Sequence, residues 1–225
     1  MPEPVDAVPV PFESRVAAAE ALADRLVPLS AAGAIVLAIP RGGVPVGAVV
    51  AHRLGLAFDI LVSHRVSAPW HPDLELGAVA ADGTRVIDVG GAVWLGSADA
   101  IRDAGTAEME RAREREHWLR AGRPAPNLEG RTVILVDDGM AMGATMQAAV
   151  LSARRSGAAR VIVAVPVASP ASVTRLQTVA DVVVAVATPE PLEAVRQWHD
   201  ALPDVSDRET AALLAGEPGW PMSPA

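Results

Sequence analysis

The sequence predicts an α/β fold with a mostly parallel central sheet, and three observations support this prediction. Short runs of β-branched apolar residues alternate with longer segments in which apolar residues recur at helical spacing. This alternation is typical of repeated strand-helix-strand units. The chain has 225 residues and no internal repeat, which favours one domain with a sizeable buried core.

The first half of the chain begins this alternation. The predicted elements are a helix at 14–30, a buried strand at 34–40, a helix at 44–54 and a strand at 58–64. Pro28 marks the end of the first helix, because proline cannot continue one. The second helix is expected to end before Gly55, with His52 and Arg53 complementing the negative end of the helix dipole. Residues 66–96 contain several prolines and glycines, which favours a loop followed by short strands.

The second half repeats the alternation after a long charged helix. The predicted elements are this helix at 97–120, strands at 132–136, 158–167 and 181–187, and helices at 145–156 and 169–179. Opposite charges three or four residues apart along the charged helix are typical of a solvated face. Ser169 and Pro170 form a typical helix start. Ser206 and Glu209 form a predicted capping box.

The composition limits the classes of partner. The formal net charge is -8, which argues against nucleic acid or an anionic membrane as the main partner. The chain has no Cys, which excludes disulfides and thiolate metal sites. No stretch resembles a secretory signal or a membrane span, so the sequence predicts a soluble, cytoplasmic protein. All 19 Lys+Arg residues are Arg, so every permanent side-chain cation is a guanidinium.

Residues 133–146 read VILVDDGMAMGATM, a buried strand that ends in two adjacent acids and a glycine-containing loop. Ligands of parallel sheets bind beyond the carboxyl ends of the strands, so Asp137 and Asp138 lie where a site is expected. The following helix offers free N–H groups and a positive dipole end, which suits a phosphate. Acids that only cap this helix are the alternative, although capping needs one acid rather than two. Carboxylates beside a phosphate seat indicate a sugar phosphate, because sugar hydroxyls donate to carboxylates.

This stretch resembles the phosphoribosyl pyrophosphate (PRPP) binding motif of the type I phosphoribosyltransferases, in which an apolar strand precedes two acids and a Thr/Gly-rich loop. The resemblance implies that Asp137 and Asp138 hold the ribose hydroxyls of PRPP and contact Mg²⁺ indirectly, through PRPP. It also implies a loop that wraps the 5-phosphate, formed by Gly139, Met140, Ala141, Met142, Gly143, Ala144 and Thr145.

A second stretch, LAIPRGGVPVG at residues 37–47, resembles the pyrophosphate loop of the same family. Gly42 and Gly43 let the backbone approach an anion, and Arg41 can hold pyrophosphate as a bidentate donor. Residues 61–83 resemble the segment where a strand ends in Arg-Lys, with Arg65 in place of the lysine. The catalytic residues implied by the resemblance are Arg41, Arg65, Asp137 and Asp138.

The resemblance implies a three-layer sandwich with a mostly parallel central sheet and a small hood. A single domain over residues 1–225 would have its core at about 14–190 and its hood in residues 66–96 and the C-terminal segment. The implied enzyme is a pentosyltransferase that uses Mg²⁺ to transfer 5-phosphoribosyl from PRPP to a nitrogenous, heterocyclic or aromatic acceptor, releasing pyrophosphate. A homodimer is a further expectation. The alternative is a non-catalytic PRPP- or nucleotide-binding regulatory module of the same fold.

Three positions depart from the family pattern. Met142 stands where Thr is usual, and the loss of one hydrogen bond to a charged group is expected to weaken PRPP binding roughly ten- to a hundredfold. Arg65 can hold pyrophosphate but cannot donate a proton as Lys can. Ala141 replaces an Asp of some purine-specific members, so that purine pattern is not supported.

Four further residues are candidate contacts to the acceptor or to the mobile loop, namely His64, Trp70, His71 and Glu75. The two histidines and Glu75 are either solvated or structural polar residues, or they contact substrate or act as a general base. Trp70 either covers a hydrophobic surface or stacks on a planar substrate.

Overall fold

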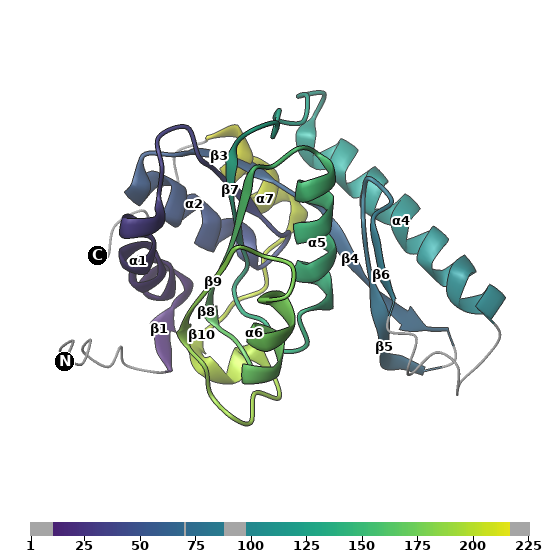
Figure 1. Ribbon diagram of the computed structural model, residues 1–225. Coiled ribbons are helices and arrows are strands. Elements are labelled where there is room, and N and C mark those ends of the chain that lie inside the picture. Colours follow the sequence, from purple (N-terminus) through teal and green to yellow (C-terminus); the bar gives the residue numbers. More distant parts are fainter. Residues whose placement is uncertain (1–10, 70, 88–97, 217–225) are drawn as a thin grey trace.

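The computed structural model describes residues 11–69, 71–87 and 98–216. A five-stranded parallel sheet lies at the centre between two layers of helices, as Figure 1 shows. The strands, in order across the sheet, are β3 (Ala57–Ile60), β2 (Ile35–Ala38), β7 (Thr132–Val136), β8 (Arg160–Val167) and β9 (Val182–Ala187). The predicted three-layer α/β architecture is therefore confirmed.

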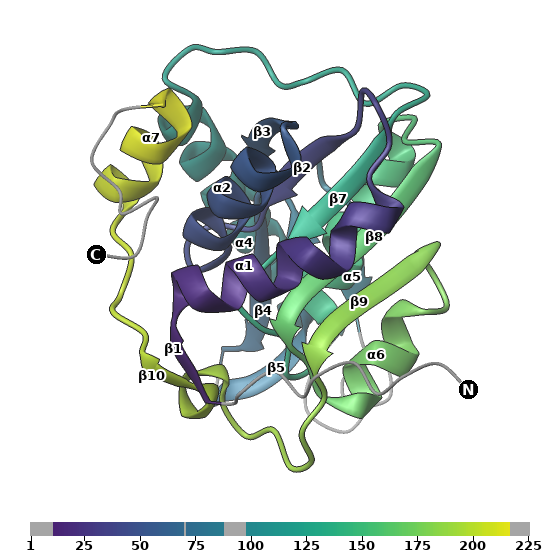
Figure 2. The same cartoon turned by 90° about the vertical axis from the view of Figure 1, so that its left-hand side faces the viewer.

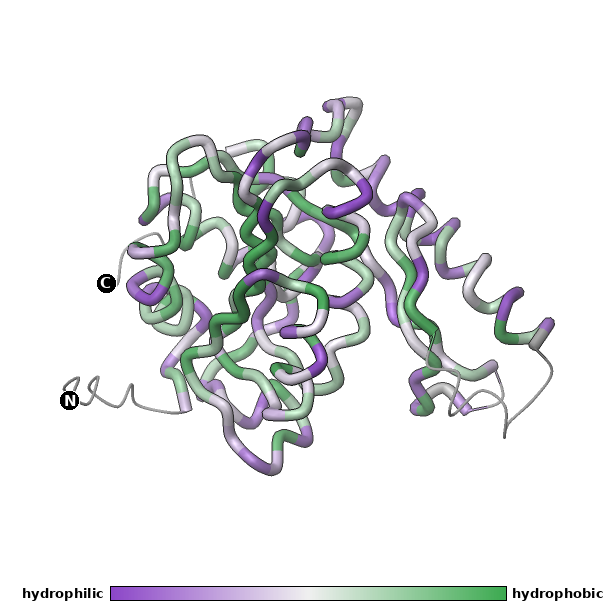
Figure 3. Tube along the Cα trace, in the orientation of Figure 1, coloured by the Kyte–Doolittle hydropathy of each residue, from purple (hydrophilic) through white to green (hydrophobic). Residues whose placement is uncertain are grey.

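Helices cover both faces of this sheet. One layer contains α1 (Arg15–Leu26) and α2 (Gly43–Leu54), and the other contains α5 (Ala144–Arg155) and α6 (Pro170–Leu176). Figure 2 views the sheet from the side of α1 and α2. Val36 and Ile134 pack with α1 and α2, whereas Leu37 and Leu135 pack with α5. Because both faces are buried, the strands are apolar along their whole length, and Figure 3 shows this concentration of apolar residues.

Two smaller sheets flank the core. The first is antiparallel and consists of β4 (Ser63–Ala68), β5 (His71–Ala80) and β6 (Arg85–Ile87), packed against α5 and α4 (Ala98–Arg120). In the second, β1 (Phe12–Ser14) pairs in parallel with β10 (His199–Ala201). Three short helices complete the described chain, namely η1 (Val27–Leu29), η2 (Val195–Trp198) and α7 (Asp207–Ala215). We call β1, η2, β10 and residues 202–205 the hood.

The composition of this hood differs from the sequence expectation, which combined residues 66–96 with the C-terminal segment. The structure pairs the C-terminal strand β10 with the N-terminal strand β1, and it places residues 63–68, 71–80 and 85–87 in the separate antiparallel sheet. Residues 88–96 lie outside the described residues. Within the described part of the chain, no helix is long and apolar enough to cross a membrane.

Local chemistry sets the ends of the helices. The Ser14 hydroxyl caps α1 by accepting a hydrogen bond from the N–H of Ala17 at 3.2 Å. Gly55 ends α2 in the left-handed conformation, with φ 62°. The predicted capping box at the start of α7 is confirmed. The strand predicted at 58–64 is divided, because β3 ends at Ile60 and β4 begins at Ser63 in another sheet.

Candidate functional site

The strand order of the central sheet reverses between β2 and β7. The chain runs from β2 outward to β3 and later returns to β7 on the other side of β2. Residues 40–43, the Arg41 loop, follow β2, and residues 137–143, the acid-pair loop, follow β7. These loops lead to helices on opposite faces of the sheet. Such a reversal opens the crevice in which α/β proteins bind ligands.

The Arg41 loop packs directly on the two acids. A Cβ at Gly43 would lie 2.8 Å from the Cα of Asp137, and a Cβ at Gly42 would overlap the carboxylate of Asp138. Glycine is therefore required at both positions for the loops to approach this closely. The peptide bond before Arg41 is cis, and the Arg41 side chain is exposed. Within the described part of the chain, Arg41 forms no ion pair, so its guanidinium is available to an anion.

The two acids have different surroundings. Asp137 is partly exposed as a residue, but its carboxyl group lies against the Arg41 loop, and its Oδ1 accepts a hydrogen bond from the N–H of Asp138 at 2.8 Å. Burial of the carboxyl group and the neighbouring charge of Asp138 raise the pKa of Asp137 well above its usual range, and the hydrogen bond from the N–H of Asp138 and the charge of Arg15 oppose this rise. Asp137 therefore keeps a proton more readily than an ordinary aspartate.

Asp138 is paired with a cation from the N-terminal end of the chain. Nε and Nη2 of Arg15 donate to Oδ2 of Asp138 at 3.3 and 3.2 Å, and Nη1 donates to the carbonyl of Pro203. Arg15 is the first residue of α1 and is only 7% exposed. One buried guanidinium thus joins the acid-pair loop to the hood and keeps a compensating charge beside Asp138.

The acid-pair loop leads into free backbone N–H groups at the start of α5. Gly143 is the N-cap, with φ 83°, and it makes no side-chain capping bond. The N–H groups of residues 141–145 donate to no backbone carbonyl of the described residues, whereas the N–H of Met140 is bonded to Val167 at 2.9 Å. Free N–H groups at the positive end of a helix dipole attract anions. The loop therefore fits a phosphate group beside the acid pair.

A pocket of about 260 Å³ opens between the acid pair and the hood. The charged side chains that line it are Arg15, Arg41, Arg196, Asp138 and Asp204, with Leu202 and Val205 adding apolar surface. Arg196 and Asp204 form an ion pair of 3.2 Å at its exposed side. We call this space the arginine pocket, since three guanidinium groups line it against two carboxylates.

The comparisons with known proteins identify the family. The phosphoribosyl transferase domain matches residues 15–190. The chain belongs to the phosphoribosyl transferase family. It is 41% identical over 207 residues to a protein provisionally named a phosphoribosyl transferase in two strains of Mycobacterium tuberculosis, H37Rv and CDC 1551. That match covers 90% of this chain and 46% of the relative, so the chain spans about half the length of these curated relatives.

A solved structure has a similar sequence and the same fold. TT1426 from Thermus thermophilus is 38% identical in sequence to this chain, and its crystal structure matches the present structure with a TM-score of 0.77. The match covers 92% of this chain and 99% of TT1426. The matched domain and the curated relatives confirm the family resemblance inferred from the sequence, and the chain is a member of a transferase family.

In this member of the family the two sequence motifs meet in the crevice, as expected from their positions after β2 and β7. The antiparallel sheet carries the other predicted residues. Arg65 is exposed on β4, and its charge acts on Glu75 of β5. Burial raises the pKa of Glu75, and the two arginines near it, Arg65 and Arg175, oppose that rise. Glu75 and Met142 line a separate pocket beside α5, so these residues do not contact the arginine pocket.

The predicted histidines lie away from the acid pair. His64 on β4 faces α4, with Nδ1 at 3.4 Å from a carboxylate oxygen of Glu108, and burial lowers the pKa of this histidine. This geometry favours the structural alternative for His64. His71 is exposed at the start of β5. Trp70 lies outside the described residues.

Two residues near the acid pair were missed from the sequence. Arg15 lies on the buried stripe of α1 together with Leu22 and Leu26, and an arginine at helical spacing with apolar residues was the available signal. His199 of β10 is buried against the ring of Phe12, with ring centroids 5.5 Å apart. Burial lowers the pKa of His199 although Asp138 raises it, and neither ring nitrogen has a well-formed hydrogen bond to a described residue.

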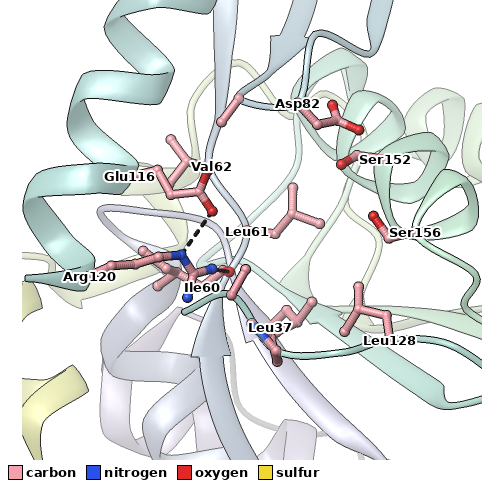
Figure 4. Close-up of a pocket in the computed structure, with 13 residues that line it drawn as sticks. Leu37, Ile60, Leu61, Val62, Asp82, Glu116, Arg120, Leu128, Ser152 and Ser156 are labelled. Carbon is pink, nitrogen blue, oxygen red and sulfur yellow. Dashed lines mark hydrogen bonds and ion pairs between the residues drawn. The ribbon is translucent and has the colours of Figure 1, made fainter. Parts of the chain in front are cut away.

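Another cavity, of about 200 Å³, lies between α4, α5 and the connection before β7, as Figure 4 shows. Its main charged group is Arg120, which donates to Asp59 at 2.9 Å and to Glu116 at 3.0 Å. No residue of the Arg41 loop or the acid-pair loop lines this cavity. Its buried cation already has its partners, so the cavity has the character of a structural ion-pair site.

Proposed function

We propose that this protein is a PRPP-dependent phosphoribosyltransferase that transfers 5-phosphoribosyl to a nitrogenous acceptor and releases pyrophosphate. The observation that supports this proposal best is the packing of the Arg41 loop on the acid pair, next to the free N–H groups of residues 141–145. A cation, two carboxylates and an anion seat occur side by side in one crevice. Pyrophosphate, ribose hydroxyls and a 5-phosphate are connected in the same sequence within PRPP.

Each group has a chemical partner in this proposal. Arg41 holds the pyrophosphate as a bidentate donor, since its guanidinium is exposed and forms no ion pair within the described residues. Asp137 and Asp138 accept hydrogen bonds from the ribose hydroxyls. The N–H groups of residues 141–145 donate to the 5-phosphate. Family membership adds support, because the matched domain covers both loops.

The acid pair also fits Mg²⁺. This ion is often bound through substrate phosphates, and the two carboxylates would face the ribose hydroxyls of the PRPP that carries it. Among the described residues, no group of three or more acids and histidines could hold a metal alone, so PRPP would supply the other oxygens. Asp137 and Asp138 would hold the ion indirectly, through PRPP. When bound, Mg²⁺ supplies positive charge that neutralises the leaving pyrophosphate.

The side chains then act on the charges that develop during transfer. As the bond from ribose C1 to pyrophosphate breaks, positive charge grows on the ribose and negative charge grows on pyrophosphate. The ionised carboxylate beside the ribose stabilises the first, and Arg41 stabilises the second. The nitrogen lone pair of the acceptor forms the new bond at C1, and any proton on that nitrogen leaves to solvent or a base.

A non-catalytic PRPP- or nucleotide-binding module is the second candidate. Its specific support is the side chain of Met142, which is 54% exposed at the phosphate loop and offers no hydroxyl where the family pattern has one. A binding module needs the same acid pair and the same N–H groups, but it does not need Arg41 to stabilise a leaving group. The two candidates therefore differ in what Arg41 does.

The test is calorimetric titration with PRPP and Mg²⁺, followed by a pyrophosphate-release assay with purine, pyrimidine and aromatic amine acceptors. We expect binding and release with at least one acceptor. The double variant D137N/D138N should lose PRPP binding, and R41Q should reduce turnover more than binding. R53Q, which breaks an exposed ion pair on α2, is the matched control. Binding without release would support the second candidate, and unchanged PRPP affinity in D137N/D138N would refute the site.

A further inference from the structure

We propose that the arginine pocket selects an acceptor that carries a carboxylate beside its reacting nitrogen-containing ring. This inference rests on the proposed phosphoribosyl transfer, and it names the substrate class of the same site. The acceptor would be an acidic heterocycle or acidic aromatic compound rather than a neutral base. Three features of the pocket support this choice, namely its position, its charge and the kind of side chains that line it.

The position of the pocket suits an acceptor. Asp138 and Arg41 line one side, and the hood residues Arg196, Leu202 and Val205 line the other. A molecule in the pocket therefore contacts the carboxylate proposed to hold the ribose. With a volume of about 260 Å³, the pocket has room for one small molecule next to the transfer site.

The charge of the pocket favours an anion. Three guanidinium groups and two carboxylates line it, and two of the guanidinium groups form ion pairs with these carboxylates. Arg15 is held by Asp138 in a buried pair, with side-chain exposures of 8% and 18%. Arg196 is paired with Asp204, but these side chains are 66% and 96% exposed. Because such an exposed pair contributes little, Arg196 can exchange Asp204 for a ligand carboxylate, while Arg41 remains with pyrophosphate.

The uncharged side chains of the pocket offer few contacts that could distinguish one ligand from another. Among the described residues, no aromatic side chain lines it, and the apolar surface comes from Leu202 and Val205. Phe12 and His199 of the hood pack on each other instead. A planar neutral ring would therefore lack a stacking partner here, so discrimination depends on the guanidinium groups. Because Arg196 is exposed, a carboxylate that accepts hydrogen bonds from it is expected to bind roughly two- to fivefold more tightly than its neutral counterpart.

The experiment uses two pairs of probes that differ in a carboxylate: orotate against uracil, and nicotinate against nicotinamide. Their dissociation constants are measured by calorimetry on the full chain with pyrophosphate and Mg²⁺ present, so that Arg41 is occupied, and pyrophosphate release is measured separately with PRPP and Mg²⁺. We expect the carboxylate of at least one pair to bind at least about twofold more tightly. R196Q should abolish that preference, and D204N should increase it, since Asp204 competes with the ligand for Arg196. R53Q should leave it unchanged.

Equal affinities within both pairs, or no binding of any probe, would overturn the inference. So would an R196Q variant that raises the KM for PRPP and keeps the carboxylate preference, because Arg196 would then serve pyrophosphate. Failure of the proposed function is seen elsewhere, as absent PRPP binding to the unmodified chain. A carboxylate preference without PRPP binding would therefore refute the transfer but not the anion site.

Discussion

Replacing Arg15 with Met tests the link between the acid pair and the hood. Methionine keeps much of the length of the side chain but removes the charge and the donors to Asp138 and Pro203. Breaking a buried pair by removing one partner typically costs about 3–5 kcal/mol. The Asp138 side chain is 18% exposed, so water can partly replace the guanidinium and we expect about 2–3 kcal/mol. For a domain of this size, that loss lowers Tm by roughly 4–12 °C.

Urea unfolding of R15M measures this loss, and R53M is the matched control. Arg53 pairs with Asp24 at 2.8 Å, but these side chains are 51% and 66% exposed, so R53M should change the unfolding free energy by less than about 0.5 kcal/mol. A double-mutant cycle with D138N should show coupling of at least about 1 kcal/mol between the two sites. If R15M is no less stable than R53M, or if the effects of R15M and D138N are additive, Arg15 does not hold the acid pair.

Three further predictions concern single residues of the site and its surroundings. Because the pKa of Asp137 is raised in the fold, the folded protein keeps a proton that the unfolded chain loses, and stability falls as pH rises above the ordinary carboxyl pKa of about 4. D137N should therefore be more stable than the unmodified chain at pH 7, with the difference vanishing below about pH 4; urea unfolding across this range checks it, and a constant difference would contradict it. M142T should tighten PRPP binding roughly ten- to a hundredfold by calorimetry, and an unchanged affinity would show that this position does not face the 5-phosphate. G105A should stabilise α4 by about 0.5–1 kcal/mol, since the nearest atom to its new Cβ is 3.8 Å away, whereas G43A should destabilise by about 1–3 kcal/mol; equal unfolding midpoints would refute the packing argument.

The central strands could be predicted well because they are buried on both faces. The strand at 132–136 was predicted with the bounds that the structure gives, since a parallel strand between two helical layers is an uninterrupted apolar run. An uninterrupted apolar run, however, does not indicate the residue at which the chain leaves a sheet. The apolar run through Leu61 and Val62 continues from the sheet of β3 toward the sheet of β4. The hydrophobic pattern alone therefore predicts one strand where the structure has two strands in different sheets.

The site was predictable where it depends on short motifs and unpredictable where it depends on long-range contacts. Both motifs follow strands, and the rule for parallel sheets places such residues at one edge. Arg15 reaches the acid pair across 123 positions of the sequence, and no local pattern specifies that contact. The pairing of β1 with β10 likewise places Phe12 beside His199, so the hood is formed by segments that are far apart in the sequence.

These contacts explain how the fold accommodates two adjacent carboxylates at the end of a buried strand. Two ionised carboxylates at such short range would repel each other and attract no polyanion. The two acids have different environments in the fold. Burial favours the protonated form of Asp137, and Arg15 compensates the charge of Asp138. The repulsion between the two acids is therefore reduced, and the exposed Arg41 adds a positive charge beside them. A phosphate-bearing substrate can then approach carboxylates that serve as hydrogen-bond acceptors, because their charge is already compensated from within the fold.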